Sequence, residues 1–140
     1  MYSTIDDLKK AIPEATLLQL TDDDNLGIID EVKVTEAIAA ADGEIDSYCA
    51  ARYTVPFDPA PAIIGKYSVD IAIYNLYSRI VETIPDTRAD RYKNAIRALE
   101  QIAKGVITLG QVPAPPEKSS AAAEITSSTR LFTRDSMKGL

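Results

Sequence analysis

The chain has 140 residues and a net charge of −6, with one cysteine and no histidine. A chain of this length can build one domain with its own hydrophobic core. One cysteine cannot form a disulfide within the chain, and the lack of histidine removes the usual zinc ligand and general base. Composition therefore argues against zinc chemistry and Ser-His-Asp catalysis, and we expect no cofactor.

The first two predicted helices are short. Ser3 or Thr4 can cap a helix whose first turn holds Asp6 and Asp7, since acidic residues are favourable at that end. Pro13 ends this helix and can open a second helical stretch, Glu14 to Leu20, because the first helical position needs no N–H. Turn-forming residues 21–27 then predict an exposed loop.

A long helix is predicted from Asp30 to Tyr53. Apolar residues recur on it at the three-and-four spacing of one buried face: Val34, Ile38, Ala41, Ile45, Tyr48 and Cys49. Prolines cannot continue a helix, so Pro56, Pro59 and Pro61 make residues 54–60 an extended link, anchored by Val55 and Phe57.

Two further helices are predicted, Pro61 to Val81 and Thr87 to Lys104. The first is apolar around most of its circumference, which indicates a central position or a contact between subunits. Gly105 is a natural left-handed cap of the second, and residues 106–109 follow as a short extended piece. The fold class is therefore all-α, a small bundle of about four helices.

From Gln111 the composition changes to proline, alanine and serine, which predicts a flexible linker. Residues 129–140 then regain apolar and basic side chains, as in a docking arm. We therefore divide the chain into a helical domain, residues 1–110, and a linker with a C-terminal arm, residues 111–140. The arm residues expected to contact a partner are Ile125, Arg130, Leu131, Phe132, Arg134 and Met137.

Residues 22–30 partly match a calcium-binding loop. Asp22, Asp24 and Asp30 fall at ligand positions one, three and nine around a central glycine. Leu26 at position five has no oxygen to offer, however, and Lys33 stands where a bidentate glutamate is required. We therefore favour an acidic turn that caps the following helix.

Other polar residues give no firm catalytic pattern. Asp42, Glu44 and Asp46 are expected to lie on a wet helix face. Cys49 is expected to be a small buried hydrophobe, because no histidine can activate it. Basic residues between 88 and 97 alternate with acids and favour a solvated face over a nucleic-acid site: Arg88, Arg91, Lys93 and Arg97.

The tyrosines of the predicted helix Pro61 to Val81 suit a surface that is apolar with one wet edge. Tyr67, Tyr74 and Tyr77 could line a subunit interface or the rim of the chain's own core, and the sequence leaves both open. We take Tyr74 and Tyr77 as candidate interface residues.

Charge is distributed unevenly. Residues 1–60 hold thirteen acidic and four basic residues, a net −9, whereas the other eighty hold eight acidic and eleven basic, a net +3. This asymmetry fits head-to-tail association of identical copies or a solvated acidic face. The overall acidity disfavours nonspecific DNA binding. No segment has the roughly 20 apolar residues of a membrane span and no signal peptide is evident, so we expect a cytoplasmic protein without membrane contact.

Three segments in order carry a family resemblance: Leu20-Thr21-Asp22, the stretch Glu44 to Pro61 with Arg52-Tyr53 before its prolines, and Gly105 to Gly110. Together they resemble the Mu-like phage connector proteins of the neck between capsid and tail. The resemblance runs from Tyr2 to about Gly110. In that family the Glu44 to Pro61 corner is a determinant of the fold, so Arg52 is assigned a structural role such as bonding the last helix carbonyls.

The resemblance implies a head-to-tail connector, not an enzyme. Such a protein would form a cyclic ring of twelve copies between the portal protein and a tail-side neck or tail terminator protein. It would act in the virion neck after assembly in the host cytoplasm, with DNA passing through its channel unbound. Asp22, Asp23 and Asp24 are candidates for lining that channel. The alternative is a small helical regulatory or nucleic-acid-binding module.

Overall fold

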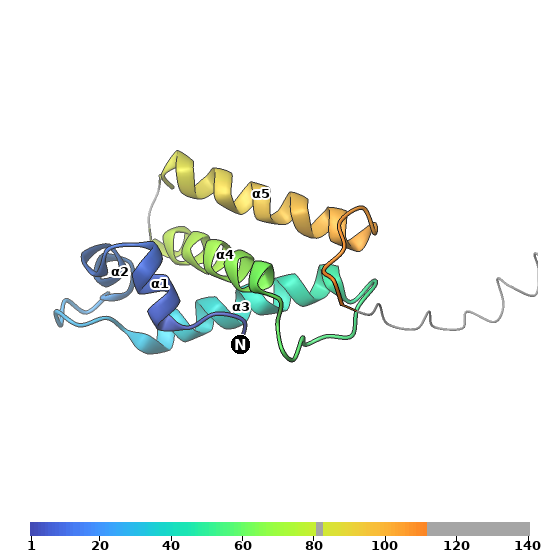
Figure 1. The fold of residues 1–140 in the computed structure, drawn as a ribbon. Coiled ribbons are helices and arrows are strands. Elements are labelled where there is room, and N and C mark those ends of the chain that lie inside the picture. The colour runs from blue at the N-terminus through green and yellow to red at the C-terminus, as the bar shows by residue number, and fades with distance from the viewer. Residues whose placement is uncertain (81–82, 112–140) are drawn as a thin grey trace, which may run out of the picture.

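The computed structural model describes residues 1–80 and 83–111, and this part of the chain contains five α-helices and no strand (Figure 1). The all-α prediction is confirmed. There is one helix more than the four expected, because the second stretch is a full eight-residue helix. The bounds are α1 Ile5–Ala11, α2 Glu14–Thr21, α3 Glu31–Cys49, α4 Ala62–Ile80 and α5 Asp86–Ala103.

The helix ends follow local chemistry. Thr4 caps α1 in a capping box with Asp7, each side chain accepting a hydrogen bond from the other residue's backbone N–H. Asp30 caps α3 by accepting from the N–H groups of Val32 and Lys33, which confirms the predicted capping role.

Helix α5 ends in a Schellman motif. The N–H of Val106 donates to the carbonyl of Gln101, and the N–H of Gly105 donates to Ile102. Gly105 has a φ of +80°, so the left-handed cap predicted there is confirmed. Residues 106–109 continue as irregular backbone that turns back toward the α3–α4 link.

Helix α4 lies between the other elements (Figure 1) and packs against α1, α2, α3 and α5. Its buried residues occupy several sides of the helix, among them Ile64, Ile71, Ile73 and Leu76. The apolar circumference of this helix therefore reflects a central position in the monomer. The core around it takes in the predicted face of α3, with Val34 and Ile45, and also Leu99 and Ile102 of α5.

Helix α3 ends at Cys49, four residues before the predicted end. The N–H groups of Arg52 and Tyr53 both donate to the carbonyl of Cys49, so the chain turns there instead of continuing the helix. The turn precedes Pro56 and buries Tyr53 under the end of the bundle. The predicted linker and arm, residues 112–140, lie outside the described residues, and the proposed domain division stays a prediction.

Candidate assembly surfaces

The corner between α3 and α4 is built on buried aromatic side chains. Tyr53 and Phe57 are 3% and 6% exposed, and their ring centroids lie 5.9 Å apart in a tilted arrangement. The ring of Tyr2 lies 6.0 Å from that of Phe57. The N-terminus and the corner are thereby packed together, although they are far apart in the sequence.

The segment after α5 is held against the same corner. The N–H of Leu109 donates to the hydroxyl of Tyr53 at 3.1 Å, and the side-chain amide of Gln111 donates to the carbonyl of Pro59 at 3.1 Å. The chain therefore leaves the described body from the end of the bundle where α3 stops.

Arg52 lies in this corner, half-buried, with its guanidinium directly beside Gly105. A Cβ at position 105 would collide with Nη1 of Arg52. The Nε of Arg52 is buried without a hydrogen-bond partner in the described part of the chain. Arg52 thus packs the end of α3 against the end of α5, which supports the structural role given to it.

A polar network ties the N-terminus to the bundle. The backbone N–H of Tyr2 donates to Asp42 at 2.9 Å, and its hydroxyl donates to Asp46 and accepts from the N–H of Phe57 at 3.0 Å. The hydroxyl of Ser68 donates to Asp42 at 2.7 Å. Burial, and then the bond to Asp46, raise the pKa of Tyr2 above its usual range.

The expectation of a wet face at positions 42–46 is therefore wrong. Asp42 and Asp46 are half-buried, and Glu44 accepts a hydrogen bond from the hydroxyl of Tyr92 at 3.0 Å. The sequence placed these carboxylates beside the apolar face, but their hydrogen-bond partners lie 26 to 48 positions away along the chain. No local pattern could have indicated them.

Tyr74 packs within its own chain. Its ring stacks on that of Tyr92 in α5, with centroids 3.9 Å apart and planes 11° from parallel. Burial, and then the bond to Glu44, raise the pKa of Tyr92 to about 12. Tyr77 is half-buried and packs against the core. Both tyrosines thus lie at the rim of the monomer's core, and their contact with a second subunit stays a prediction.

The loop between α2 and α3 is folded around its own acidic residues. Both carboxylate oxygens of Asp22 accept from loop backbone, the N–H groups of Leu26 and Gly27, each at 2.8 Å. Asp23 forms ion pairs with Lys33 at 2.9 Å and Arg79 at 2.8 Å, which lower its pKa. The third candidate channel residue, Asp24, is exposed.

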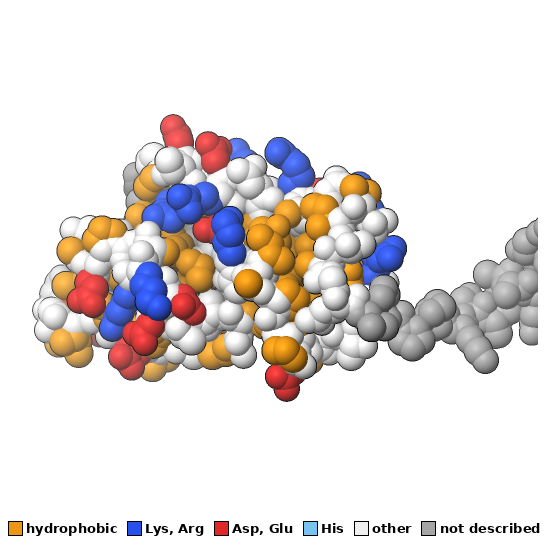
Figure 2. Space-filling model, in the orientation of Figure 1, with side chains coloured by type: hydrophobic (Ala, Val, Ile, Leu, Met, Phe, Trp, Pro, Cys, Tyr) orange, Lys and Arg blue, Asp and Glu red, His pale blue; other side chains and the backbone are white. Residues whose placement is uncertain are grey.

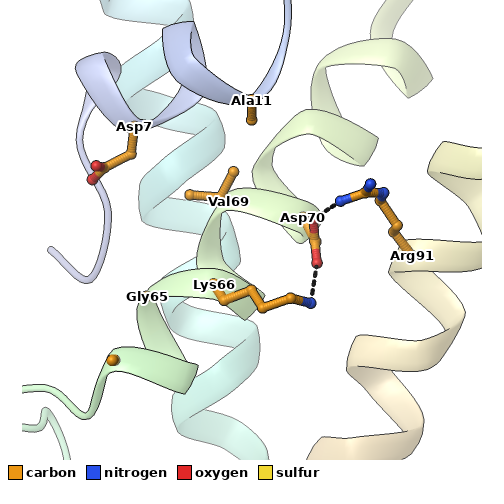
Figure 3. Close-up of a pocket in the computed structure, with 8 residues that line it drawn as sticks. Asp7, Ala11, Gly65, Lys66, Val69, Asp70 and Arg91 are labelled. Atoms are coloured by element: carbon orange, nitrogen blue, oxygen red, sulfur yellow. Dashed lines mark hydrogen bonds and ion pairs between the residues drawn. The ribbon is translucent and has the colours of Figure 1, made fainter.

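A buried acid joins α4 to α5. The side chain of Asp70 is 5% exposed and lies 3.2 Å from the ammonium of Lys66 and 3.9 Å from the guanidinium of Arg91 (Figure 3). It lines a hollow of about 390 Å³ together with Asp7 and Ala11 of α1. The pairing satisfies a carboxylate that would otherwise be costly to bury.

The basic face of α5 is partly used inside the chain. Arg88 donates to the carbonyl of Ala11 at 3.0 Å and Arg91 reaches Asp70, whereas Lys93 and Arg97 are exposed. Two of the four residues therefore hold helices together, which agrees with the preference for an ordinary surface over a nucleic-acid site.

Large apolar side chains are exposed at both ends of the bundle. Beside the start of α3, Leu26, Ile28 and Val32 are 68%, 64% and 66% exposed. At the other end, after α5, Val106 is 71% exposed and Ile107 38%. Figure 2 shows hydrophobic and acidic side chains together at the end of the molecule where the α2–α3 loop lies. Such apolar groups on a surface mark candidate protein contacts.

The candidate contact residues of the arm, from Ile125 to Met137, lie outside the described residues. Within residues 1–80 and 83–111, no group of three or more acidic or cysteine side chains is placed to hold a metal ion. None of the helices in this part is both long and apolar enough to cross a bilayer.

Comparison with known protein families identifies the family of this chain. Residues 2–127 match the model of the family described as Bacteriophage Mu, Gp36. The chain belongs to the Bacteriophage Mu Gp36 family. The expected membership of a Mu-like phage family is thereby confirmed, and the matched residues include the corner and both of its neighbouring helices.

A curated relative of the Gp36 family is the Mu-like prophage FluMu protein gp36 of Haemophilus influenzae. It is 38% identical over 82 residues, which make up 59% of this chain and 56% of the relative. The match thus spans little more than half the length of the relative. These comparisons associate the chain with Mu-like phages and prophages, and its place in the particle is a separate question.

Proposed function

We propose that this Gp36-family chain is a head-to-tail connector of a Mu-like phage or prophage. In this role it forms a cyclic ring of twelve copies between the portal protein and a tail-side neck or tail terminator protein. The ring extends the channel for DNA and offers a platform for tail attachment, so the protein works in the virion neck. The observation that carries the proposal is the family match over residues 2–127.

The described body supports a part in assembly. It is a small helical bundle whose two ends expose apolar side chains, Leu26, Ile28 and Val32 at one and Val106 at the other. A contact between unlike ends of identical subunits is heterologous, and it closes into a ring when the rotation between neighbours allows. The two ends thus offer surfaces of the kind that a ring requires.

Charge supports passage of DNA without binding. The net charge of −6 is concentrated in residues 1–60, and carboxylates lining a channel would repel phosphates. Asp22 and Asp23 already bond within their own chain, so among the three candidate channel residues Asp24 is the freest to face a channel. Exposed acids outside this loop can contribute as well: Asp6, Glu14, Glu36 and Asp58.

Sedimentation velocity of the full chain, alone and mixed with the portal protein of the same phage, tests the proposal. We expect a large ring or a portal-dependent complex, and electron microscopy of that fraction should show an annulus. A monomer that forms no complex with the portal protein and retards DNA on a gel would refute the connector role and favour the nucleic-acid-binding module.

A further inference from the structure

The α2–α3 loop carries the densest group of exposed large apolar residues in the described part of the chain. Leu26, Ile28 and Val32 lie within seven positions, and each is about two-thirds exposed. We call these three residues the loop patch. Burying one such side chain contributes about 1.5–3 kcal/mol, so the patch is a strong candidate for a covered surface.

The loop patch is held in shape by the bundle. Arg79 of α4 donates to the carbonyl of Leu20 at 2.8 Å and pairs with Asp23, while Lys33 of α3 pairs with both Asp23 and Asp30. A hollow of about 480 Å³ adjoins Ile28 and is bounded by side chains of α1, α2 and the loop. The surface is therefore preformed, and an occupant would not have to order it.

The surroundings of the loop patch are acidic. Residues 22–33 hold five acidic residues and one base, a net −4, and Asp24 and Glu31 are among the exposed ones. Arg79 offsets one further charge. An occupant of this surface should therefore combine apolar side chains with positive charge.

One segment of this chain has that chemistry. Residues 129–140 contain Leu131, Phe132 and Met137 together with three basic residues and one acid, a net +2. We infer that the segment 129–140 of one copy binds the loop patch of a neighbouring copy. This inference rests on the proposed ring and names the contact that joins its subunits.

The loop before α3 and the last described residue, Gln111, lie at opposite ends of the bundle (Figure 1). Gln111 is held at Pro59, beyond the end of α3, whereas the loop patch lies at its start. The nineteen residues of α3 separate them by about 28 Å. Residues 112–128 can extend over at most about 60 Å, enough to reach an adjacent subunit.

The linker is long enough to reach either patch, and we favour docking between copies because of this polarity. A neighbouring copy can place the end that carries its α2–α3 loop against the end of this copy where Gln111 lies. The neighbour's loop patch is then close to Gln111 of this copy, whereas this copy's own loop patch is one length of α3 away. Each copy then gives an arm at one end and receives one at the other, which is the heterologous arrangement that closes into rings. An arm that orders on binding covers a large surface for its length.

Cross-linking of two singly substituted full-length chains tests this inference. One chain carries Ile28→Cys and the other, distinguished by a tag, carries Phe132→Cys; native Cys49 is fully buried. The chains are mixed, alone and with portal protein, and oxidised. We expect the mixed dimer to exceed both like dimers beyond random collision, and its yield to fall with salt.

A second substitution of an exposed apolar residue by glutamate provides the control. Val32→Glu, added to the Ile28→Cys chain, should reduce the mixed dimer about tenfold or more, because it loses apolar burial and adds a carboxylate to an acidic surface. Ile63→Glu, at an isoleucine in the first turn of α4 that is 40% exposed and outside the loop patch, should leave the yield unchanged. Equal effects of the two substitutions would overturn the inference.

The remaining outcomes separate this contact from the connector itself. A chain that carries both substitutions and forms only an intramolecular disulfide would show that the arm binds its own body. That result would refute the inference. Rings or portal complexes without the mixed dimer would also refute it while the proposed function stands. A mixed dimer in samples that never form a ring would support the contact and count against the connector.

Discussion

The guanidinium of Arg52 occupies the space beside Gly105 that any side chain at position 105 would need. This contact joins the end of α3 to the left-handed cap of α5, at φ +80°. The corner and the last described segment are therefore one structural unit, and a substitution in either should change the packing of the other.

Gly105→Ala should destabilise the full chain by about 2 kcal/mol, since left-handed backbone is unfavourable for a residue with a Cβ and the guanidinium must also move. Gly110 is the matched control, with a φ of +72° and no atom of the described residues within 4 Å of an added Cβ. Gly110→Ala should cost about 1 kcal/mol. Urea denaturation measures the free energy of unfolding of both variants. Equal losses would show that the Arg52 side chain moves aside without a cost in stability.

Tyr2→Phe should lower the free energy of unfolding by about 1–2 kcal/mol, because it leaves the Asp46 carboxylate and the Phe57 N–H without their partner. Tyr67→Phe is the control, since the Tyr67 hydroxyl makes no hydrogen bond to the described residues. That variant should stay within about 0.5 kcal/mol of the wild type. Comparable losses in the two variants would refute the role of the network.

Alkaline pH should weaken the fold through Tyr92. The folded state raises the pKa of this phenol to about 12, so the neutral form is favoured, and its contribution is complete below the usual value of about 10. The contribution is lost as pH rises from about 10 through 12. Tyr92→Phe should therefore flatten the decline of stability over this range, measured by urea denaturation at several pH values. An unchanged slope would contradict the assignment.

Cys49 should react slowly with a disulfide reagent in the folded protein. The side chain is fully buried, and burial raises the pKa of its thiol to about 11 from an ordinary 9.0. Two pKa units alone reduce the thiolate about a hundredfold at neutral pH. Absorbance of the released thiol measures the rate, with urea-unfolded protein as the control. Equal rates in the folded and unfolded protein would show that the reagent reaches the Cys49 thiol freely in the folded state.

The helices themselves were largely predictable because their signals are local. Capping residues such as Thr4 and Asp30, the proline at 13 and the glycine at 105 mark where helices begin and end. The apolar spacing of α3 also identified its buried face correctly. The end of α3 was predicted four residues too far, because the turn at Cys49 depends on burying Tyr53 among distant partners.

The candidate surfaces were predicted less completely. In the loop patch only Leu26 falls in the loop that was predicted to be exposed. Ile28 and Val32 carry no signal that separates them from core residues, and their exposure appears only once the core is assembled. Likewise, Asp42 and Asp46 have the spacing of a solvated face, and only the approach of Tyr2 turns them into hydrogen-bond acceptors.

The sequence alone determined that this chain is helical, where most of its helices lie, and which family it resembles, since caps, prolines and apolar periodicity act over a few residues. Tertiary structure decided the rest: α4 at the centre, Arg52 against Gly105, Tyr74 stacked on Tyr92, and an apolar loop left uncovered at one end. These contacts join residues far apart in the chain, and no local pattern specifies which of many possible partners will meet.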